Sequence, residues 1–430
     1  MNEDNIFITP TDDVGQPGHS LVYAPFTDSV ALATNEECQQ LEQALANPEA
    51  ASEEIRETLE ALRFDGDPHS LFRTVERVDD FLLLYVLPNN ICNFSCSYCF
   101  SAKGRGGGML DVKCLRATLA WFIDNSRTTS PQLAISYLGG GEPTLSWPVV
   151  KEGLEYAAAL AERQGIKLIT SIVTNGSRIT DEMVDTFSRL KVAPRVSFEI
   201  LPRIQNLQRG HYNEVKAGLL KLERCAIPPM IRSMITPDNV CLMEEMVEEV
   251  HRSYPAVKHL LMDPITSAEV FNDADFTKSF YALYHEHFIS AQRLAESYGI
   301  RLECAPLRNI ELLAERFCTG EFCLTPQGTI TVCHQVASPK EKHYKEFQYA
   351  HFDEATGKMA VDEERFRKLT AIGRVYDNPK CANCFIKWNC GGGCLMQNLQ
   401  YKPEVLDVIC EATRRLSKYF LLCKAMSYTE

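Results

Sequence analysis

The cysteines constrain this chain more than any other feature, because they are numerous and gathered in two places. Of the 17 cysteines among 430 residues, three lie within Cys92–Cys99 and eight lie between Cys318 and Cys410. The N-terminal stretch Met1–Pro10 is acidic and lacks the basic start and apolar run of an export signal, so we expect a cytoplasmic protein. Disulfides are rare in that reducing compartment, and metal ligation is the expected role of the grouped cysteines.

The charge and the apolar runs exclude two classes of partner. A formal net charge of −13 argues against a surface built for nucleic acid or for anionic membranes, since both need net basic patches. The longest apolar run, Phe81–Pro88, has the length of a strand, far short of the roughly 20 residues that cross a bilayer. We therefore expect neither nucleic acid nor membrane as a partner.

The two ends of the chain differ from its centre. Residues 1–80 are predicted to form a small α+β element, with a hairpin at His19–Ala33 and helices at Asn35–Leu45 and Ser52–Leu62. Residues 301–430 are predicted to be a loop-rich domain with little apolar periodicity. A domain of that kind needs bound metal to hold it together.

Residues 81–300 alternate short apolar runs with amphipathic stretches, which predicts an α/β fold. Six such βα units indicate a partial parallel (β/α)6 barrel, in which the loops after the strands carry the chemistry. The predicted strands are Phe81–Leu87, Leu133–Leu138, Leu168–Thr174, Arg195–Ile200, Met230–Ile235 and Lys258–Met262. The predicted helices are Leu110–Asn125, Val149–Gln164, Asp181–Leu190, Tyr212–Arg224 and, leading out of the barrel, Thr277–Tyr298.

Cys92, Cys96 and Cys99 form a C-x3-C-x2-C group directly after the first predicted strand. Three thiolates on one short loop can bind three irons of a cubane and leave the fourth iron open. That open iron can chelate the amino and carboxylate groups of a small molecule. A zinc site would instead require four closed ligands.

The segment Cys92-Asn-Phe-Ser-Cys96-Ser-Tyr-Cys99 resembles the signature of the radical S-adenosylmethionine (SAM) superfamily. The resemblance implies a [4Fe-4S] cluster and SAM, whose reductive cleavage yields a 5′-deoxyadenosyl radical. Gly139-Gly140-Gly141-Glu142-Pro143 resembles the family's GGEP segment, which implies that Gly140, Gly141 and Glu142 receive the methionine ammonium of SAM. Thr174 and Asn175 match the polar turn that the family places near SAM.

Further SAM contacts are implied by the same resemblance. Relatives carry Ser-x-Asp-Gly on the fourth strand as a ribose contact, whereas this chain has Ser197-Phe198-Glu199-Ile200, with Glu199 in place of the Asp. Arg209 is a candidate partner of the SAM carboxylate, with a solvated surface arginine as the alternative. Tyr98 resembles the aromatic residue that packs against adenine.

Seven C-terminal cysteines resemble the SPASM extension, which in relatives carries two auxiliary iron–sulfur clusters, giving three [4Fe-4S] clusters in all. The alternative is a pair of structural zinc sites. By the family's interleaved pattern, one auxiliary cluster is held by Cys381, Cys384, Cys390 and Cys410, and the other by Cys318, Cys333 and Cys394. The fourth ligand of the second set is Cys323, Cys304 or none, and Cys323 can equally be a core residue of an apparent strand. Five further cysteines are interpreted as buried small apolar residues: Cys38, Cys114, Cys225, Cys241 and Cys423.

Relatives with SPASM extensions act mostly on peptides or proteins, which implies an oxidoreductase that modifies a ribosomally made peptide, for example by a thioether cross-link. The alternative within the family is a sulfatase-maturing enzyme that generates formylglycine. Its relatives have Asp after the cysteine at the Cys333 position, where it can act as a base. This chain has His334, which could take that role when neutral, but the departure points away from that group. Residues 1–80 faintly resemble part of a leader-peptide recognition module, with a barrel-capping decoration as the alternative.

Two further expectations concern partners and catalysis. The electron donor is expected to be a flavodoxin or ferredoxin. No motif surrounds Asp263, His334 or Tyr212 that would assign an acid or a base.

A second function hypothesis, of a non-enzymatic class, is an iron–sulfur electron carrier, which would hold clusters without cleaving SAM.

Overall fold

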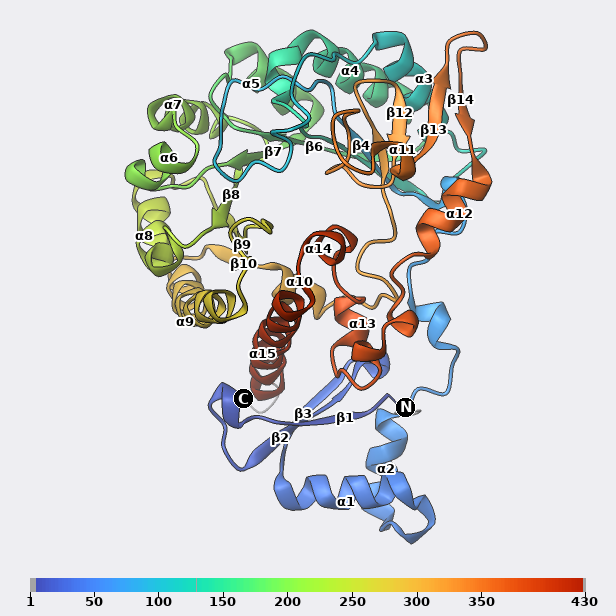
Figure 1. The fold of residues 1–430 in the computed structure, drawn as a ribbon, viewed down its shortest axis with the longest axis vertical. Helices are drawn as coiled ribbons and strands as arrows, with labels where there is room; N and C mark the ends of the chain where they lie inside the picture. The colour runs from blue at the N-terminus through green and yellow to red at the C-terminus, as the bar shows by residue number, and fades with distance from the viewer. Residues whose placement is uncertain (1–4, 129, 428–430) are drawn as a thin grey trace.

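A computed structural model describes residues 5–128 and 130–427. Its main body is a curved parallel sheet enclosed by helices (Figure 1). The parallel strands are β4 (Leu83–Val86), β5 (Gln132–Tyr137), β6 (Lys167–Thr174), β7 (Val192–Ser197), β8 (Met230–Ile235), β9 (His259–Pro264) and β10 (Arg301–Glu303). The helices between them are α3 (Val112–Phe122), α4 (Trp147–Gln164), α5 (Asp181–Leu190), α6 (Pro202–Gln208), α7 (Tyr212–Leu222), α8 (Met243–Ser253) and α9 (Ala274–Ser297).

Strands β4 to β9 lie side by side in sequence order, which confirms the predicted (β/α)6 arrangement. The sheet extends beyond those six strands on both sides. Strand β10 pairs in parallel with β9, and β11 (Phe322–Leu324) pairs in parallel with β4. An antiparallel run then follows: β12 (Thr329–Thr331), β13 (Gln348–Asp353) and β14 (Lys358–Val361).

The barrel strands alternate between an apolar face and a polar face. The apolar residues are fully buried in the main core, for example Leu84, Ile135, Ile172, Val196 and Ile231. The residues between them share the opposite, inner face through in-register pairing: Tyr85, Ser136, Ser171, Arg195, Ser197 and Arg232. Residues two apart on a strand point the same way, so Val173 and Met230 share this inner face, and Val173 packs against buried Leu87 and Leu138. The inner face therefore mixes polar side chains with apolar ones.

Strand β7 was predicted at Arg195–Ile200 but occupies Val192–Ser197, so Glu199 lies in the loop after the strand. The backbone explains where the strand ends. Ile200 has φ of 63° and is fully buried, a left-handed conformation that is costly for a β-branched residue. Ile200 stands where the related pattern has glycine, which adopts this conformation without strain.

The N-terminal residues form a separate small sheet, seen at the bottom of Figure 1. As predicted, β2 (His19–Ala24) and β3 (Ser29–Thr34) make a hairpin, which β1 (Phe7–Pro10) extends. Helices α1 (Asn35–Ala46) and α2 (Glu53–Leu62) cover this sheet, and Thr34 and Glu37 form a capping box at the start of α1. The hydroxyl of Tyr23 donates to Asn389 Oδ1 at 3.0 Å, which joins the small sheet to the C-terminal region.

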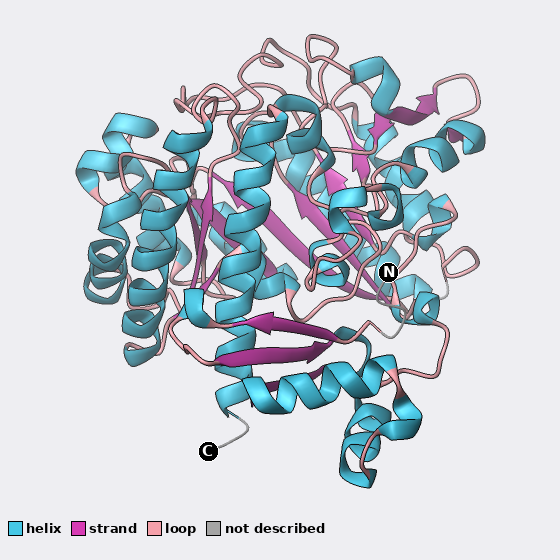
Figure 2. Cartoon of the chain, turned by 60° about the horizontal axis from the view of Figure 1, so that its bottom comes forward, coloured by secondary structure: helices cyan, strands magenta, loops and turns pink. Residues whose placement is uncertain are grey.

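The prediction of a loop-rich C-terminus is wrong for residues 403–427, which form the long helix α15 (Pro403–Ser427). This helix packs along α9 and against β3, so it joins the barrel to the N-terminal sheet (Figures 1 and 2). Its lysines reach that sheet, because Lys418 Nζ lies 2.7 Å from Asp13 Oδ1 and Lys424 Nζ lies 2.8 Å from Asp28 Oδ1. The shorter helices before it are α10 (Ala305–Asn309), α11 (Tyr344–Phe347), α12 (Glu363–Ala371), α13 (Lys387–Cys390) and α14 (Leu395–Gln400).

Two cysteines expected in the core are exposed, Cys241 and Cys423. Cys241 lies in a short 3-10 turn before α8. Cys423 lies near the end of α15, on an exposed part of its surface. Cys38, Cys114 and Cys225 are buried as predicted. In the part of the chain that the structure describes, no helix is long and apolar enough to cross a membrane.

Candidate active site

The loop after β4 carries the first cysteine group. Burial raises the pKa of Cys96, the charge of Arg209 opposes that shift, and the thiols Cys99 and Cys92 add to it. The backbone N–H of Phe94 donates to Cys92 Sγ at 3.4 Å, and Arg105 Nη2 donates to Cys99 Sγ at 3.2 Å. N–H donors to sulfur stabilise thiolate ligands, which fits three ligands of an iron–sulfur cluster.

The glycine loop after β5 packs directly on the segment that leads into the cysteines. A Cβ on Gly140 would lie 2.5 Å from Asn90 Oδ1, and one on Gly141 would lie 2.2 Å from the Ile91 carbonyl oxygen. Asn89 Nδ2 donates to the Glu142 carbonyl at 2.9 Å and closes the same contact. Glycine is required here because two backbones approach each other beside the cluster loop.

Glu142 is 2% exposed and joins the ends of β5 and β6. Its Oε1 accepts hydrogen bonds from the Thr144 hydroxyl at 2.7 Å and the Thr174 hydroxyl at 2.6 Å, and its Oε2 accepts from the Asn175 N–H at 2.7 Å. Three residues predicted from two separate motifs therefore meet at one point. The Thr144 N–H also donates to Oε1, at 3.1 Å, so Oε1 is fully used. Oε2 has a single donor among the described residues and keeps room for one more.

A second buried carboxylate, Glu199, lies in the loop after β7 with Tyr98 and Arg209. The Tyr98 hydroxyl donates to Glu199 Oε1, and Arg209 Nη1 donates to the Tyr98 oxygen at 3.0 Å. Ser233 and the Met234 N–H donate to Glu199 Oε2 at 2.5 and 3.0 Å. Burial raises the pKa of Glu199, while the positive charge of Arg209 opposes that shift.

Arg209 is therefore a buried arginine and not a solvated surface residue. Its Nε is buried and has no hydrogen-bond partner among the described residues, and its charge also acts on Cys96. An unsatisfied buried donor beside the cysteine loop is what a ligand carboxylate would satisfy. Ser197 ends β7 on the inner face of the barrel, directly opposite Arg232 on β8.

The charges of the C-terminal cysteines act on one another within two sets, and their role as cluster ligands stays a prediction. Burial raises the pKa of Cys390 to about 12, and the charges of Cys410, Cys384 and Cys381 contribute to that shift. Cys410 comes from α15, whereas the other three come from the loop and short helix before it.

The second group joins Cys318, Cys333 and Cys394. Burial raises the pKa of Cys333 well above its usual value, and Glu321, Cys318 and Cys394 act in the same direction. Cys323 is fully buried in β11 and its pKa responds to Cys333, whereas the environment of Cys304 includes Asp263 and Tyr284 and no other thiol. Of the two cysteines considered as a fourth ligand, Cys323 is the one near the group.

The three residues without a motif have distinct environments. His334 Nδ1 lies 2.7 Å from Glu321 Oε1, and its ring centroid lies 5.8 Å from that of Tyr85. Asp263 Oδ1 accepts from the Ala305 N–H at 2.7 Å. Tyr212 is buried against Phe198 and Tyr254 in the core.

Among the described residues, no three His, Cys, Asp or Glu side chains are placed to hold one metal ion.

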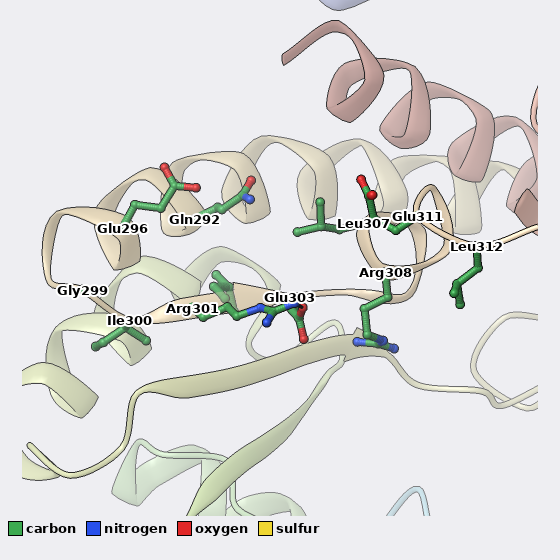
Figure 3. A pocket seen from close by; sticks show the side chains of 11 residues that line it. Gln292, Glu296, Gly299, Ile300, Arg301, Glu303, Leu307, Arg308, Glu311 and Leu312 are labelled. Carbon is green, nitrogen blue, oxygen red and sulfur yellow. Dashed lines mark ion pairs between the residues drawn. The ribbon is translucent and has the colours of Figure 1, made fainter. Parts of the chain in front are cut away.

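A cavity of about 1030 Å3 connects the barrel to the C-terminal cysteines. Its wall combines the carboxyl ends of β8 and β9 with α10, α14 and α15 and includes Arg232, Asp263, Arg308, Cys384 and Cys394. A separate pocket of about 730 Å3 lies between α9, β10 and α10 (Figure 3). Its lining has no thiol, so the chemistry is expected in the first cavity.

The fold and this site define a class, an α/β barrel with a cysteine triad on the loop after its first strand. Residues 86–250 match the family model described as the Radical SAM superfamily. This part of the chain is therefore a radical SAM domain. A domain of this kind implies SAM and a [4Fe-4S] cluster as cofactors.

Similarity to individual proteins is low in sequence and broad in fold. The radical SAM cyclopropyl synthase TigE of Paramaledivibacter caminithermalis is 21% identical over 168 residues, which is 35% of this chain and 34% of that protein. The chain thus matches about a third of the length of this curated relative. Native anSMEcpe with bound AdoMet superposes with a TM-score of 0.59 at 17% identity, over 80% of this chain and 99% of that chain. Streptococcus suis SuiB bound to its precursor peptide SuiA has a TM-score of 0.54 at 16% identity, over 86% and 85%.

Several contacts of the site had no signal in the sequence. Arg105 and Ser233 belong to no motif, although one contacts Cys99 and the other contacts Glu199. Asn89 and Asn90, just before Cys92, support the glycine loop. Their position beside the cysteine motif, in a polar pair after an apolar strand, is the one feature that could have identified them.

Proposed function

We propose that this chain is a radical SAM oxidoreductase with two auxiliary [4Fe-4S] clusters that oxidatively modifies a ribosomally made peptide. The observation that carries the proposal is the cavity of about 1030 Å3, which has the ends of β8 and β9 on one side and, on the other, the group of Cys381, Cys384, Cys390 and Cys410 together with Cys394 of the second group. Residues 81–300 would supply the radical domain and residues 301–430 the SPASM domain.

The radical site would be assembled by residues of the first four strand ends. Cys92, Cys96 and Cys99 would hold the cluster, which together with SAM supplies a 5′-deoxyadenosyl radical when both are bound. Gly140 and Gly141 keep the backbone close enough to the cysteine loop for SAM to reach it. Glu142 offers its remaining acceptor position on Oε2, and Arg209 offers its unpartnered Nε to a carboxylate.

Tyr98, Glu199 and Arg209 would act as one unit beside SAM. Their mutual hydrogen bonds leave Glu199 with donors on both oxygens, so it positions Tyr98 more than it offers acceptors to a ribose. Tyr98 would present its ring, and Thr174 and Asn175 would hold the next loop in place through Glu142.

The auxiliary groups favour a net oxidation. Removing one hydrogen atom from the substrate leaves a carbon radical, and a second electron must leave to form a new bond. Cysteine groups that line the same cavity give that electron an acceptor close to the substrate. A flavodoxin or ferredoxin would return electrons to the radical site.

A peptide substrate is supported by the dimensions of the cavity and by the N-terminal sheet. A volume of about 1030 Å3 accommodates several side chains, since drug-sized ligands occupy roughly 300 to 1,000 Å3. The three-stranded sheet β1–β2–β3 ends in strand edges, and an extended leader peptide can pair with such an edge. The neighbouring structures with bound peptides, SuiB with SuiA and anSMEcpe with Kp18Cys, have the same fold.

Formylglycine formation on a sulfatase-type substrate is the second candidate. It is favoured by His334, whose Nδ1 lies 2.7 Å from Glu321 and whose ring contacts Tyr85 on the inner face of the barrel. A carboxylate-oriented imidazole in that position could accept a proton from a substrate thiol or hydroxyl.

The test uses the full chain, reconstituted anaerobically with iron and sulfide and supplied with SAM and dithionite. A short peptide encoded beside the gene is co-expressed with the enzyme and analysed by mass spectrometry. We expect loss of two hydrogens from the peptide, abolished by Cys96→Ala. Clusters without 5′-deoxyadenosine would indicate the electron carrier instead. An unchanged peptide together with conversion of a sulfatase-derived cysteine peptide would favour the second candidate.

A further inference from the structure

Three arginines gather on the inner wall of the barrel, and none of the motifs accounts for them. Arg195 lies on β7 and Arg232 on β8, and the pairing of Ser197 with Arg232 puts both on the same face of the sheet. Arg308 comes from α10. In Figure 3 its side chain extends toward the neighbouring strands, away from the side chains of Leu307 and Glu311 on the same short helix. Arg232 and Arg308 line the cavity described above.

Only one carboxylate accompanies this cluster. Asp263 Oδ2 lies 3.3 Å from Arg308 Nη2 and 3.8 Å from Arg232 Nη2, and Asp263 Oδ1 is occupied by the Ala305 N–H. Another acid, Glu321, is paired with His334, whose ring responds to the charge of Arg232. Arg232 and Arg308 therefore share one acidic partner, Asp263, and Arg195 has none among the described residues.

The hydrogen-bonding capacity of the arginines is largely unused. Within residues 5–128 and 130–427, the exposed side chains of Arg195 and Arg232 donate no hydrogen bond to another residue, and Arg195 has no ion pair. Arg308 Nη1 is buried and has no partner. Burial lowers the pKa of Arg195, and the charges of Arg232 and Arg308 add to that effect while Tyr85 opposes it. Arg195 and Arg232 are exposed, so their guanidinium groups are open to a ligand, and an anion bound between them would offset the repulsion of like charges.

The barrel triad and the two C-terminal cysteine groups have arginines of their own. Arg105 and Arg209 act on the thiols of the barrel loop, Arg316 acts on Cys318, and Arg414 acts on Cys381 and Cys410. Of the three inner-wall arginines, Arg308 acts on one thiol, Cys304. The inner-wall cluster is thus a positive site in its own right, in a chain whose net charge is −13.

We propose that Arg195, Arg232 and Arg308 form a binding site for a carboxylate, and that its ligand is an Asp or Glu side chain of the substrate peptide. This inference rests on the proposed peptide-modifying function and narrows its substrate class to peptides with an acidic residue close to the modified one. Guanidinium groups match a carboxylate in a bidentate geometry, and the site lies on the wall of the substrate cavity. The acidic side chain would fix which residue of the peptide faces the radical.

Binding of small defined probes to the anaerobic holoenzyme tests the proposal. The probes are N-acetyl-Gly-Glu-Gly-amide, its Gln counterpart, and N-acetyl-Gly-Gly-Gly with a free C-terminal carboxylate, each titrated by NMR. We expect the Glu probe to bind at least about tenfold more tightly than the Gln probe, because a charge-assisted bidentate contact is lost in the amide. Equal affinities for these two probes would overturn the site.

The source of the carboxylate is separated by two further measurements. Saturating S-adenosylhomocysteine should leave the affinity for the Glu probe unchanged. Competition between the two would assign the arginines to the cofactor carboxylate and would overturn the proposal. Tighter binding of the probe with a free C-terminus would assign the site to a chain end and would overturn the side-chain assignment.

Variants connect the binding to these residues. Arg232→Gln should weaken the Glu probe by about tenfold, whereas Arg232→Lys, which keeps the charge but not the fork, should fall in between. Arg116→Gln removes an exposed arginine that pairs with Glu152 on the outer helices and serves as the matched control. Wild-type affinity for the Glu probe in correctly folded, fully iron-loaded Arg232→Gln would refute the assignment. Probe binding without any peptide modification would leave this site standing and reject the proposed function.

Discussion

The two cysteine-bearing regions of this molecule are assembled in different ways. Cys92, Cys96 and Cys99 stand on a single loop after β4, so the chain brings them together locally. The group Cys381, Cys384, Cys390 and Cys410 is complete only when α15 packs against the barrel, because Cys410 belongs to that helix. One site depends on a loop and the other on tertiary structure, so damage to one should leave the other largely intact.

The largest expected effect is from Cys96→Ala, which removes the central ligand of the local site. Formation of 5′-deoxyadenosine should fall by about 1000-fold or more, because an incomplete cluster cannot supply the radical. Iron content should fall by about one third, since three clusters are expected. Both are measured by chromatography and iron analysis after anaerobic reconstitution. Loss of all the iron would show that the two regions are not independent.

Cys410→Ala removes the one cysteine that α15 contributes to the group of Cys381, Cys384 and Cys390. Peptide product should fall by about 100-fold, while 5′-deoxyadenosine formation falls far less than in Cys96→Ala, because the radical site keeps its ligands. Exposed Cys423→Ala, on the same helix, is the matched control and should behave as wild type. Loss of SAM cleavage in Cys410→Ala would show that the radical site depends on the group that contains Cys410.

Gly141→Ala tests how closely the glycine loop approaches the cysteine loop. The new Cβ would lie 2.2 Å from the Ile91 carbonyl oxygen, so a backbone must move and the free energy of unfolding should fall by about 1 to 3 kcal/mol. In Gly108→Ala the Cβ would meet only the end of the Gln327 side chain, at 2.9 Å, and that side chain can turn away. Chemical denaturation compares the two, and equal losses would argue against the backbone contact.

The smallest effect concerns pH and the junction between α9 and α15. The pKa of His285 is lowered to about 4, mainly by burial and also by the charge of Arg415, while a hydrogen bond to the Ala412 backbone opposes both. Since the unfolded state binds the proton first, the free energy of unfolding should fall as pH drops below 6.5, by about 1 kcal/mol by pH 5.5. His285→Gln should lack this part of the pH dependence in thermal melts at the two pH values. An identical pH dependence in both proteins would exclude His285 as its source.

The sequence predicted the barrel well because buried parallel strands and amphipathic helices have distinct patterns, as β8 and α5 show at their predicted limits. It failed where tertiary contacts decide. Strand β7 ends before the predicted limit, and Ile200 beyond it has a left-handed φ. The prediction for the C-terminal region rested on the cysteine spacing and did not use the apolar residues that α15 buries, which include Val405, Leu416, Phe420 and Leu421. Arg209 was left open between surface and site, since only the folded chain shows its buried contact with Tyr98.

The position of α15 also has a consequence for biosynthesis. The sheet β1–β2–β3 leaves the ribosome before the barrel, but the helix that packs on β3 is made after it. Until α15 has been made, the N-terminal sheet lacks this partner and the group around Cys390 lacks Cys410. Domains tend to fold in the order of their synthesis, so docking of the sheet and completion of that cysteine group both wait for the same helix.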